Sequence, residues 1–122
     1  MEEQNKVQAT YSTELTSQSK LKEYSDQIGM CVIADRNFTP SKNQIKFIAL
    51  ELQKDFPELP MEIFKKIMLN GIKGKYDVKY QTPINSRTIF TWFRNCFLTK
   101  QGKFYENIGG KIFIDGIESP NY

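Results

Sequence analysis

Apolar residues recur with helical spacing most clearly between residues 41 and 56. The stretch opens with Ser41 and Gln44 in the S-x-x-Q form of a capping box, which marks the start of a helix. The apolar positions then fall on one helical face, at Ile45, Ile48, Ala49, Leu52 and Phe56. This pattern predicts a helix that stops at Pro57, because proline disrupts a helix interior.

A second helix is predicted between residues 60 and 71. Pro60 can occupy its first turn, and Glu62 is favourable near the positive N-terminal end. Gly71 is expected to end this helix, and its inner face carries Phe64, Ile67 and Met68. The residues that follow, 71–83, hold two glycines, several lysines and a Thr-Pro pair, which is typical of an irregular basic connection with room for a short strand at 76–80.

A third helix is predicted over residues 86–99, SRTIFTWFRNCFLT, with Asn85 or Ser86 as its N-cap. Its inner side is expected to hold Ile89, Phe90, Phe93 and Phe97, which recur at helical spacing. Its more polar side carries Arg87, Thr88, Thr91, Arg94 and Asn95. Trp92 falls between the two sides, and we expect it to pack in the core, with contact to the hairpin or to a partner as the alternative.

Two segments have the character of strands. Residues 30–34, MCVIA, form a short apolar run before Asp35, which predicts a brief buried strand. After Gly102 the spacing becomes alternating, and residues 103–107 and 111–115 flank the Gly109-Gly110 pair, which predicts a β-hairpin. We expect Phe104, Ile108 and Phe113 on one face of the hairpin, and Tyr105, Ile112 and Ile114 on the other.

This order of elements predicts an α+β fold that is mainly helical. A short N-terminal strand, three core helices and a C-terminal β-hairpin follow one another, which resembles the order in a winged helix-turn-helix domain. A small α+β domain whose hairpin only closes the core fits the same order. Residues 1–27 are expected to form a flexible polar tail or a weak helix, residues 28–116 the single folded domain, and residues 117–122 a loose C-terminus.

The net charge of +3 is unevenly distributed along the chain. Residues 1–60 hold seven Lys or Arg against nine Asp or Glu, whereas residues 61–122 hold ten against five. A basic half favours a negatively charged partner, most often nucleic acid, although a charge of this size also simply keeps proteins soluble.

The composition disfavours several classes of site. The chain has no histidine, which is the commonest general base and metal ligand. Cys31 and Cys96 lack the spacing of a zinc site and are expected to be buried thiols, and the acidic residues show no paired spacing. We therefore expect a protein that is not an enzyme and has no cofactor and no metal. No apolar run reaches membrane length, so we expect no membrane contact and a cytoplasmic location.

The polar side of the third predicted helix is the candidate for reading bases. Arginine can pair with guanine and asparagine with adenine, and the candidates are Arg87, Thr88, Thr91, Arg94 and Asn95. Lysines that neighbour the helix in sequence would hold phosphates, namely Lys73, Lys75, Lys100, Lys103 and Lys111, the last at the hairpin tip. An ordinary solvated surface would carry the same residue types, so that interpretation stays open.

Two resemblances to known families bear on this interpretation. The run Trp92-Phe93-Arg94-Asn95 is similar to the W-F-x-N run of homeodomains, but Cys96 and Phe97 stand where that family has basic residues, so we do not assign the chain to it. Residues 41–97 resemble small proteins carried by bacteriophages and mobile elements of Bacteroidetes-type bacteria. The matching residues are Phe56, Pro57, Leu59, Glu62, Ile63, Phe64, Gly71, Gly74, Lys75, Tyr76, Trp92, Phe93 and Phe97. That resemblance implies a phage or mobile-element context and a role near DNA replication.

Together these patterns lead to two functional hypotheses. The first is a small non-enzymatic DNA-binding or replication-accessory protein whose partner is nucleic acid. The alternative is a protein-interaction module, such as a phage inhibitor of a host complex, an adaptor or a minor virion component, in which exposed aromatic side chains form the contact. The sequence does not fix the oligomeric state.

Overall fold

The computed structural model describes residues 19–77 and 82–119 of the chain. Helices cover residues 19–34, Lys42–Asp55 (α2), Met61–Ile72 (α3) and Ser86–Arg94 (α4). The strands follow as Cys96–Leu98 (β1), Phe104–Ile108 (β2), Lys111–Ile114 (β3) and Ile117–Glu118 (β4). Helices and strands are therefore segregated along the chain, and the predicted α+β class is confirmed.

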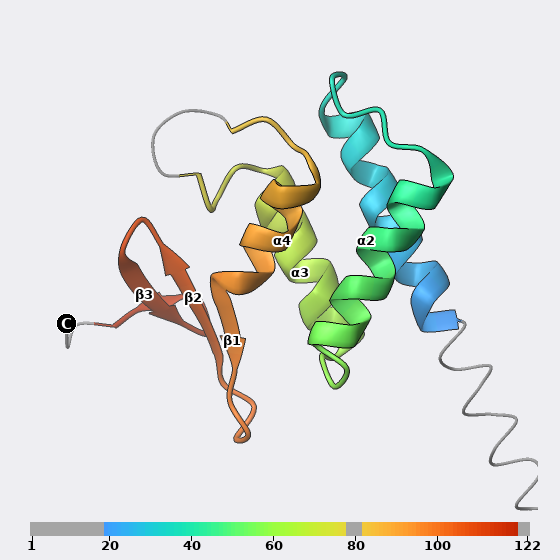
Figure 1. The fold of residues 1–122 in the computed structure, drawn as a ribbon. Coiled ribbons are helices and arrows are strands. Elements are labelled where there is room, and N and C mark those ends of the chain that lie inside the picture. The colour runs from blue at the N-terminus through green and yellow to red at the C-terminus, as the bar shows by residue number, and fades with distance from the viewer. Residues whose placement is uncertain (1–18, 78–81, 120–122) are drawn as a thin grey trace, which may run out of the picture.

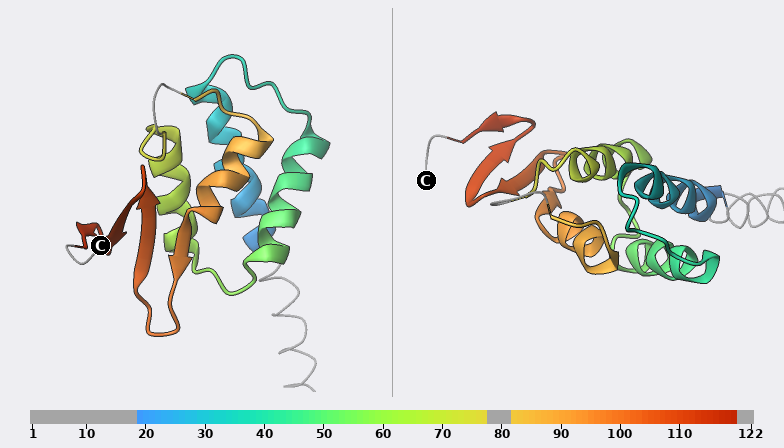
Figure 2. Two further views of the ribbon diagram at one scale, coloured as in Figure 1. Left: turned by 60° about the vertical axis from the view of Figure 1, so that its left-hand side comes forward. Right: turned by 90° about the horizontal axis from the view of Figure 1, so that it is seen from above.

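The helices form two layers, and the sheet packs against one end of them (Figures 1 and 2). Seen from above in Figure 2, α2 and α4 lie in one layer, and α3 lies with the helix of residues 19–34 in the other. The sheet stands beside α3 and α4, on the side away from α2. One long side of α4 consequently faces solvent instead of another helix.

The helix of residues 19–34 replaces the strand predicted at 30–34. Tyr24, Ile28 and Cys31 are fully buried, and their spacing of four and three residues is helical. The prediction was wrong because Met30 to Ala34 is the last turn of this longer helix, whose earlier part carries many polar residues. The helix also crosses residue 28, where the sequence analysis placed the start of the folded domain.

The predicted start of α2 is confirmed. Ser41 is its N-cap, and the Ser41 hydroxyl accepts a hydrogen bond from the Gln44 amide at 3.1 Å. Ile48, Ala49 and Leu52 are buried as the spacing predicts. The Gln44 side chain does not complete a reciprocal capping box, because it donates instead to the Ser86 hydroxyl of α4 at 3.1 Å.

The role of Gly71 differs from the predicted one. Phe64, Ile67 and Met68 are buried in α3 as expected, but the helix continues to Ile72, so Gly71 lies inside it. A Cβ atom at position 71 would overlap the indole ring of Trp92. The glycine is needed for the close approach of α3 and α4, and Gly74, with a φ of +80°, shapes the turn that follows. Most of the short strand predicted at 76–80 lies outside the described residues.

The third predicted helix is shorter than expected. Asn85 caps α4, because its side chain accepts from the Thr88 amide at 3.0 Å, but α4 ends at Arg94 and residues 96–98 form β1. Ile89 and Phe93 are buried as predicted, and Trp92 is buried in the core. Phe97, predicted to be in the core, is 65% exposed, because the change from helix to strand turns it to the outer face of the sheet.

The sheet is an antiparallel meander with the order β1-β2-β3-β4. Tyr105 pairs with Ile114 and Glu106 with Phe113, across a turn in which Gly109 and Gly110 have positive φ values. The predicted hairpin and both of its faces are therefore confirmed. Strands β1 and β4 were missed, and β4 lies where the sequence predicts a loose end. The pairing places five apolar side chains on the outer face, namely Phe97, Tyr105, Ile112, Ile114 and Ile117.

Aromatic rings join the two helical layers at the centre of the core. The Phe64 ring stacks on Tyr24 with a centroid distance of 3.7 Å and meets Phe93 at 5.1 Å. These three residues come from the helix of residues 19–34, from α3 and from α4, and all are buried. The helix of residues 19–34 is thus an integral part of the core.

Candidate nucleic-acid interface

The solvent-facing side of α4 carries a row of polar side chains. Arg87, Thr91 and Arg94 are all exposed, and their spacing of four and three residues sets them on one face of the helix. The Thr91 hydroxyl donates to the Arg87 carbonyl at 2.7 Å, so its lone pairs stay available to a donor. The structure therefore brings these three predicted residues together as one surface, here called the α4 row.

Thr88 and Asn95 occupy different surroundings from the α4 row. Thr88 is half-buried, and its hydroxyl donates to the Pro83 carbonyl at 2.8 Å, which fixes the chain entering α4. Asn95 is a half-buried C-cap, and its carbonyl accepts from the Asn107 amide of β2 at 2.8 Å. Both residues stabilise the ends of α4, so their hydrogen-bonding groups are less available to a partner than those of the α4 row.

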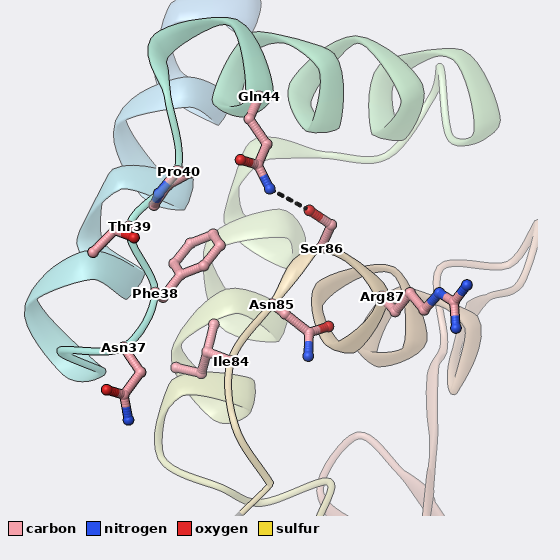
Figure 3. Close-up of a pocket in the computed structure, with 9 residues that line it drawn as sticks. All are labelled: Asn37, Phe38, Thr39, Pro40, Gln44, Ile84, Asn85, Ser86 and Arg87. Carbon is pink, nitrogen blue, oxygen red and sulfur yellow. Dashed lines mark hydrogen bonds between the residues drawn. The ribbon is translucent and has the colours of Figure 1, made fainter.

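The N-termini of α2 and α4 lie at the same end of the molecule (Figure 1). The hydrogen bond from Gln44 to Ser86 joins them across the rim of an open cavity of about 470 Å³ (Figure 3). Figure 3 shows Phe38 and Ile84 facing each other across this cavity, while Arg87 points away from it along α4. Because helix N-termini carry partial positive charge, two of them side by side favour anions at this end.

Asp35 holds the loops at this end in place. One of its carboxylate oxygens accepts from the Ile84 amide at 3.0 Å, and the other accepts from the Asn37 amide at 2.9 Å. Both hydrogen bonds lower the pKa of the Asp35 carboxyl below its usual value, and the one from the Ile84 amide has the larger effect. Asp35 thereby ties the loop before α2 to the segment before α4 as an ionised carboxylate.

Acidic residues are absent from the segments that build this surface. Residues 36–50 contain three basic and no acidic residues, and residues 82–105 contain four basic and no acidic residues. Helix α4 and the first half of α2 both lie within these segments. The basic second half of the chain thus contributes α4, and residues 36–50 of the first half add the start of α2, to one cationic layer; the carboxylates of α2, Glu51 and Asp55, lie in its second half.

The five candidate lysines do not form a single cluster. Lys100 and Lys103 are exposed in the turn between β1 and β2, whereas Lys111 follows the turn at the other end of β2. Lys73 and Lys75 follow the C-terminal end of α3, which lies toward the N-terminus of α4 (Figure 1). The lysines therefore flank α4 at both ends. Two of them also have acidic neighbours, Lys75 with Glu106 at 3.8 Å and Lys111 with Glu118 at 4.0 Å.

A buried polar cluster that was not predicted from the sequence lies between the helices and the sheet. Glu106 is 1% exposed, and its carboxylate accepts from the Tyr76 hydroxyl at 2.5 Å and from the Asn70 amide at 3.1 Å. The Tyr76 hydroxyl also lies 3.5 Å from the Cys96 sulfur. The alternation of Phe104, Glu106 and Ile108 was a usable signal, because it places Glu106 on the inner face of β2.

Burial raises the pKa values of both cysteine thiols and of the Tyr76 phenol. Burial, reinforced by the coulombic effect of Glu106, raises the pKa of the Cys96 thiol to about 11, although the Tyr76 hydrogen bond lowers it. Burial also raises the pKa of Cys31 to about 12 and that of the Tyr76 phenol above its ordinary value. Both thiols are therefore protonated at neutral pH.

Neither a metal cluster nor a membrane-spanning helix is found among the residues that the structure describes. Among residues 19–77 and 82–119, no three His, Cys, Asp or Glu side chains are grouped so that they could hold a metal ion. No described helix is both long enough and apolar enough to cross a membrane. Comparison of the chain with protein-family models, with curated proteins and with solved structures yields no match.

Proposed function

We propose that this chain is a small non-enzymatic DNA-binding protein that contacts DNA through the α4 row. The observation that carries the proposal is the cationic layer of α4 and the first half of α2, on which Arg87, Thr91 and Arg94 of α4 are exposed on one helical face. Nucleic acid is the partner that such a surface suits best, because its phosphates attract cations along the whole contact.

The dimensions of α4 suit a major groove. Nine residues give a helix about 13 Å long, and Arg87 and Arg94 stand about 10 Å apart along its axis. A major groove admits an α-helix, and arginine there pairs with guanine through two hydrogen bonds. We assign base contacts to Arg87 and Arg94, with Thr91 between them as a further polar contact.

The lysines at both ends of α4 suit the phosphates on either side of the groove. Lys100 and Lys103 would hold one backbone, and Lys73, Lys75 and Lys111 the other. The amides at the start of α2 and α4 add donors for a phosphate at the same end. This assignment is a winged-helix type of docking, with α4 as the recognition helix and the turn before Lys111 as the wing.

The proposal includes the setting that the sequence resemblance implies. Such a protein would act in the cytoplasm, in a phage or mobile element, as an accessory near DNA replication. The α4 row supports DNA binding and gives no separate support for this biological setting. The experiment below therefore tests DNA binding.

The test compares DNA binding by the unchanged chain with that by two double variants. Arg87→Ala with Arg94→Ala removes the two exposed arginines, whereas Lys22→Ala with Lys54→Ala removes two exposed cations elsewhere. Fluorescence anisotropy with duplex and single-stranded DNA at several salt concentrations should show a loss of at least about tenfold for the arginine variant. The lysine variant should stay within about threefold, and the salt dependence should be flatter for the arginine variant.

Two results would refute this function. One is the lack of salt-sensitive binding to either form of DNA at micromolar protein. The other is an equal loss of affinity in the two double variants, which would mean that net charge and not the α4 row drives binding.

A further inference from the structure

Strand β1 has a free edge with hydrogen-bonding groups directed away from the sheet. The Asn107 amide donates to the Asn95 carbonyl, and the Thr99 amide donates to the Lys103 carbonyl, so residues 95, 97 and 99 face β2. The backbone groups of Cys96 and Leu98 therefore point to the opposite side. No strand within the described part of the chain pairs with that side, because β1 is the first strand in the sheet order.

An apolar groove of about 570 Å³ runs beside this edge. One wall is β1 itself with the turn after it, and the other wall is the loop between α2 and α3, from Phe56 to Leu59. Ile67, Phe93 and Phe104 also line it. Phe97, which contributes to the lining, is one of the most exposed large apolar side chains of the described residues.

We propose that this edge and groove bind an extended segment of a partner protein, which pairs with β1 as an additional strand. An edge strand supplies backbone hydrogen bonds to such a segment, and an adjacent groove receives every second side chain. Cys96 and Leu98 offer two N–H and two C=O groups, which is enough to fix the register of a short segment. The two apolar walls require apolar residues at alternate positions of the segment.

The charges around the groove define the partner further. Lys100 lines it at the β1–β2 turn, and Lys66 lies over the Phe104 ring at 5.4 Å from the ring centroid. Glu58 is an acidic residue among those that line the groove. Two cations against one carboxylate favour a segment with an acidic flank, so the partner is an extended apolar segment flanked by Asp or Glu.

A second copy of this chain suits the edge less well. Antiparallel pairing of β1 with its own copy, centred on Phe97, would bring Arg94 of one chain toward Lys100 of the other, twice in each dimer. Like charges set opposite each other across a strand pair destabilise it. The charge pattern at the ends of β1 thus selects a partner of different sequence.

The test uses a displayed library of random dodecapeptides on the full-length protein. Selected peptides should share two apolar residues at alternate positions with an acidic residue beside them. A synthetic copy of the best peptide should slow hydrogen exchange at the Cys96 and Leu98 amides. Failure to select any binding peptide, or protection at the amides of α4 instead, would overturn the proposal.

Variants of Leu98 test the backbone contact itself. Leu98→Pro removes an N–H that does not face β2, whereas Leu98→Ala shortens the side chain and keeps the N–H. The affinity for the peptide should be at least about tenfold lower in Leu98→Pro than in Leu98→Ala, because the proline variant loses one backbone hydrogen bond to the peptide. Equal binding by the two variants would refute pairing at this edge.

A surface variant keeps the test decisive if Leu98→Pro does not fold. Lys100→Glu should weaken binding of the acidic peptide at least about tenfold, with Lys54→Glu on α2 as the matched control.

A dimer in light scattering that Leu98→Pro converts to a monomer would show that a second copy fills the edge, and would overturn the partner assignment. Arg87→Ala should leave peptide binding unchanged, so this test is independent of DNA binding.

Discussion

The helices and the sheet differ in what they bury and in what they expose. The helices bury aromatic rings around Phe64 and expose the cations of the α4 row, together with separate apolar side chains such as Ile33, Phe47 and Leu69. The sheet buries the carboxylate of Glu106 and exposes Phe97 and Ile117, which are 65% and 74% accessible. A large apolar surface left in water is typical of contact sites, whereas an apolar interior is typical of the part that holds a fold together. We infer that the helices supply most of the stability, whereas the strand pairing gathers five apolar side chains on the single outer face of the sheet.

The largest expected effect is the loss of a ring from the helical core. Phe64→Ala should lower the free energy of unfolding by about 3–5 kcal/mol, because the ring is fully buried between Tyr24 and Phe93. Urea unfolding followed by circular dichroism measures the change. Leu69→Ala, at an exposed position of the same helix, is the matched control and should change stability by less than about 1 kcal/mol. Equal effects would contradict the assignment of stability to the helical core.

A smaller effect is expected at the junction of the helices and the sheet. Glu106→Ala should lower the free energy of unfolding by about 1–3 kcal/mol, because the Tyr76 hydroxyl and the Asn70 amide lose their acceptor. Glu106→Gln keeps an acceptor of the same shape and should be less destabilising in the same urea titration. An equal loss for Gln and for Ala would mean that the negative charge beside Lys75, and not the hydrogen bonds, matters most.

The smallest effect is expected on the outer face of the sheet. Phe97→Ser should change the free energy of unfolding by no more than about 0.5 kcal/mol, because most of the ring is already in water. Phe93→Ser, four residues earlier and 1% exposed, is the contrasting variant and should be strongly destabilising in thermal unfolding. If Phe97→Ser were comparably destabilising, the outer face would have to be covered, and the contrast between helices and sheet would fail.

The elements that could be predicted are those with local signals at their ends. Ser41 and Asn85 cap α2 and α4 as their side chains suggest, and the Gly109-Gly110 pair marks the hairpin. These signals act over three or four residues, so they are visible in the sequence. The exposure of Arg87 and Arg94 was also predictable, since it follows from helical spacing alone.

The errors arose where one spacing fits two structures. A separation of four residues places Phe93 and Phe97 on one face of a helix, but four is also an even number and so fits one face of a strand. The chain leaves the helix at Asn95, and this break has no strong local signal. The hydrogen-bond partners of Glu106 could not be predicted for another reason. Tyr76 and Asn70 lie 30 and 36 residues away in sequence, so no local pattern links them to Glu106.

The contact of Gly71 with Trp92 sets a limit on how this chain can diverge. Any side chain at position 71 overlaps the indole, so a residue larger than glycine is tolerated there only if position 92 becomes smaller at the same time. Each change alone passes through a destabilised intermediate, with either a clash or a cavity between α3 and α4. The two positions are therefore expected to vary as a pair among related sequences, and their joint variation would reveal the crossing of the two helices without any structure.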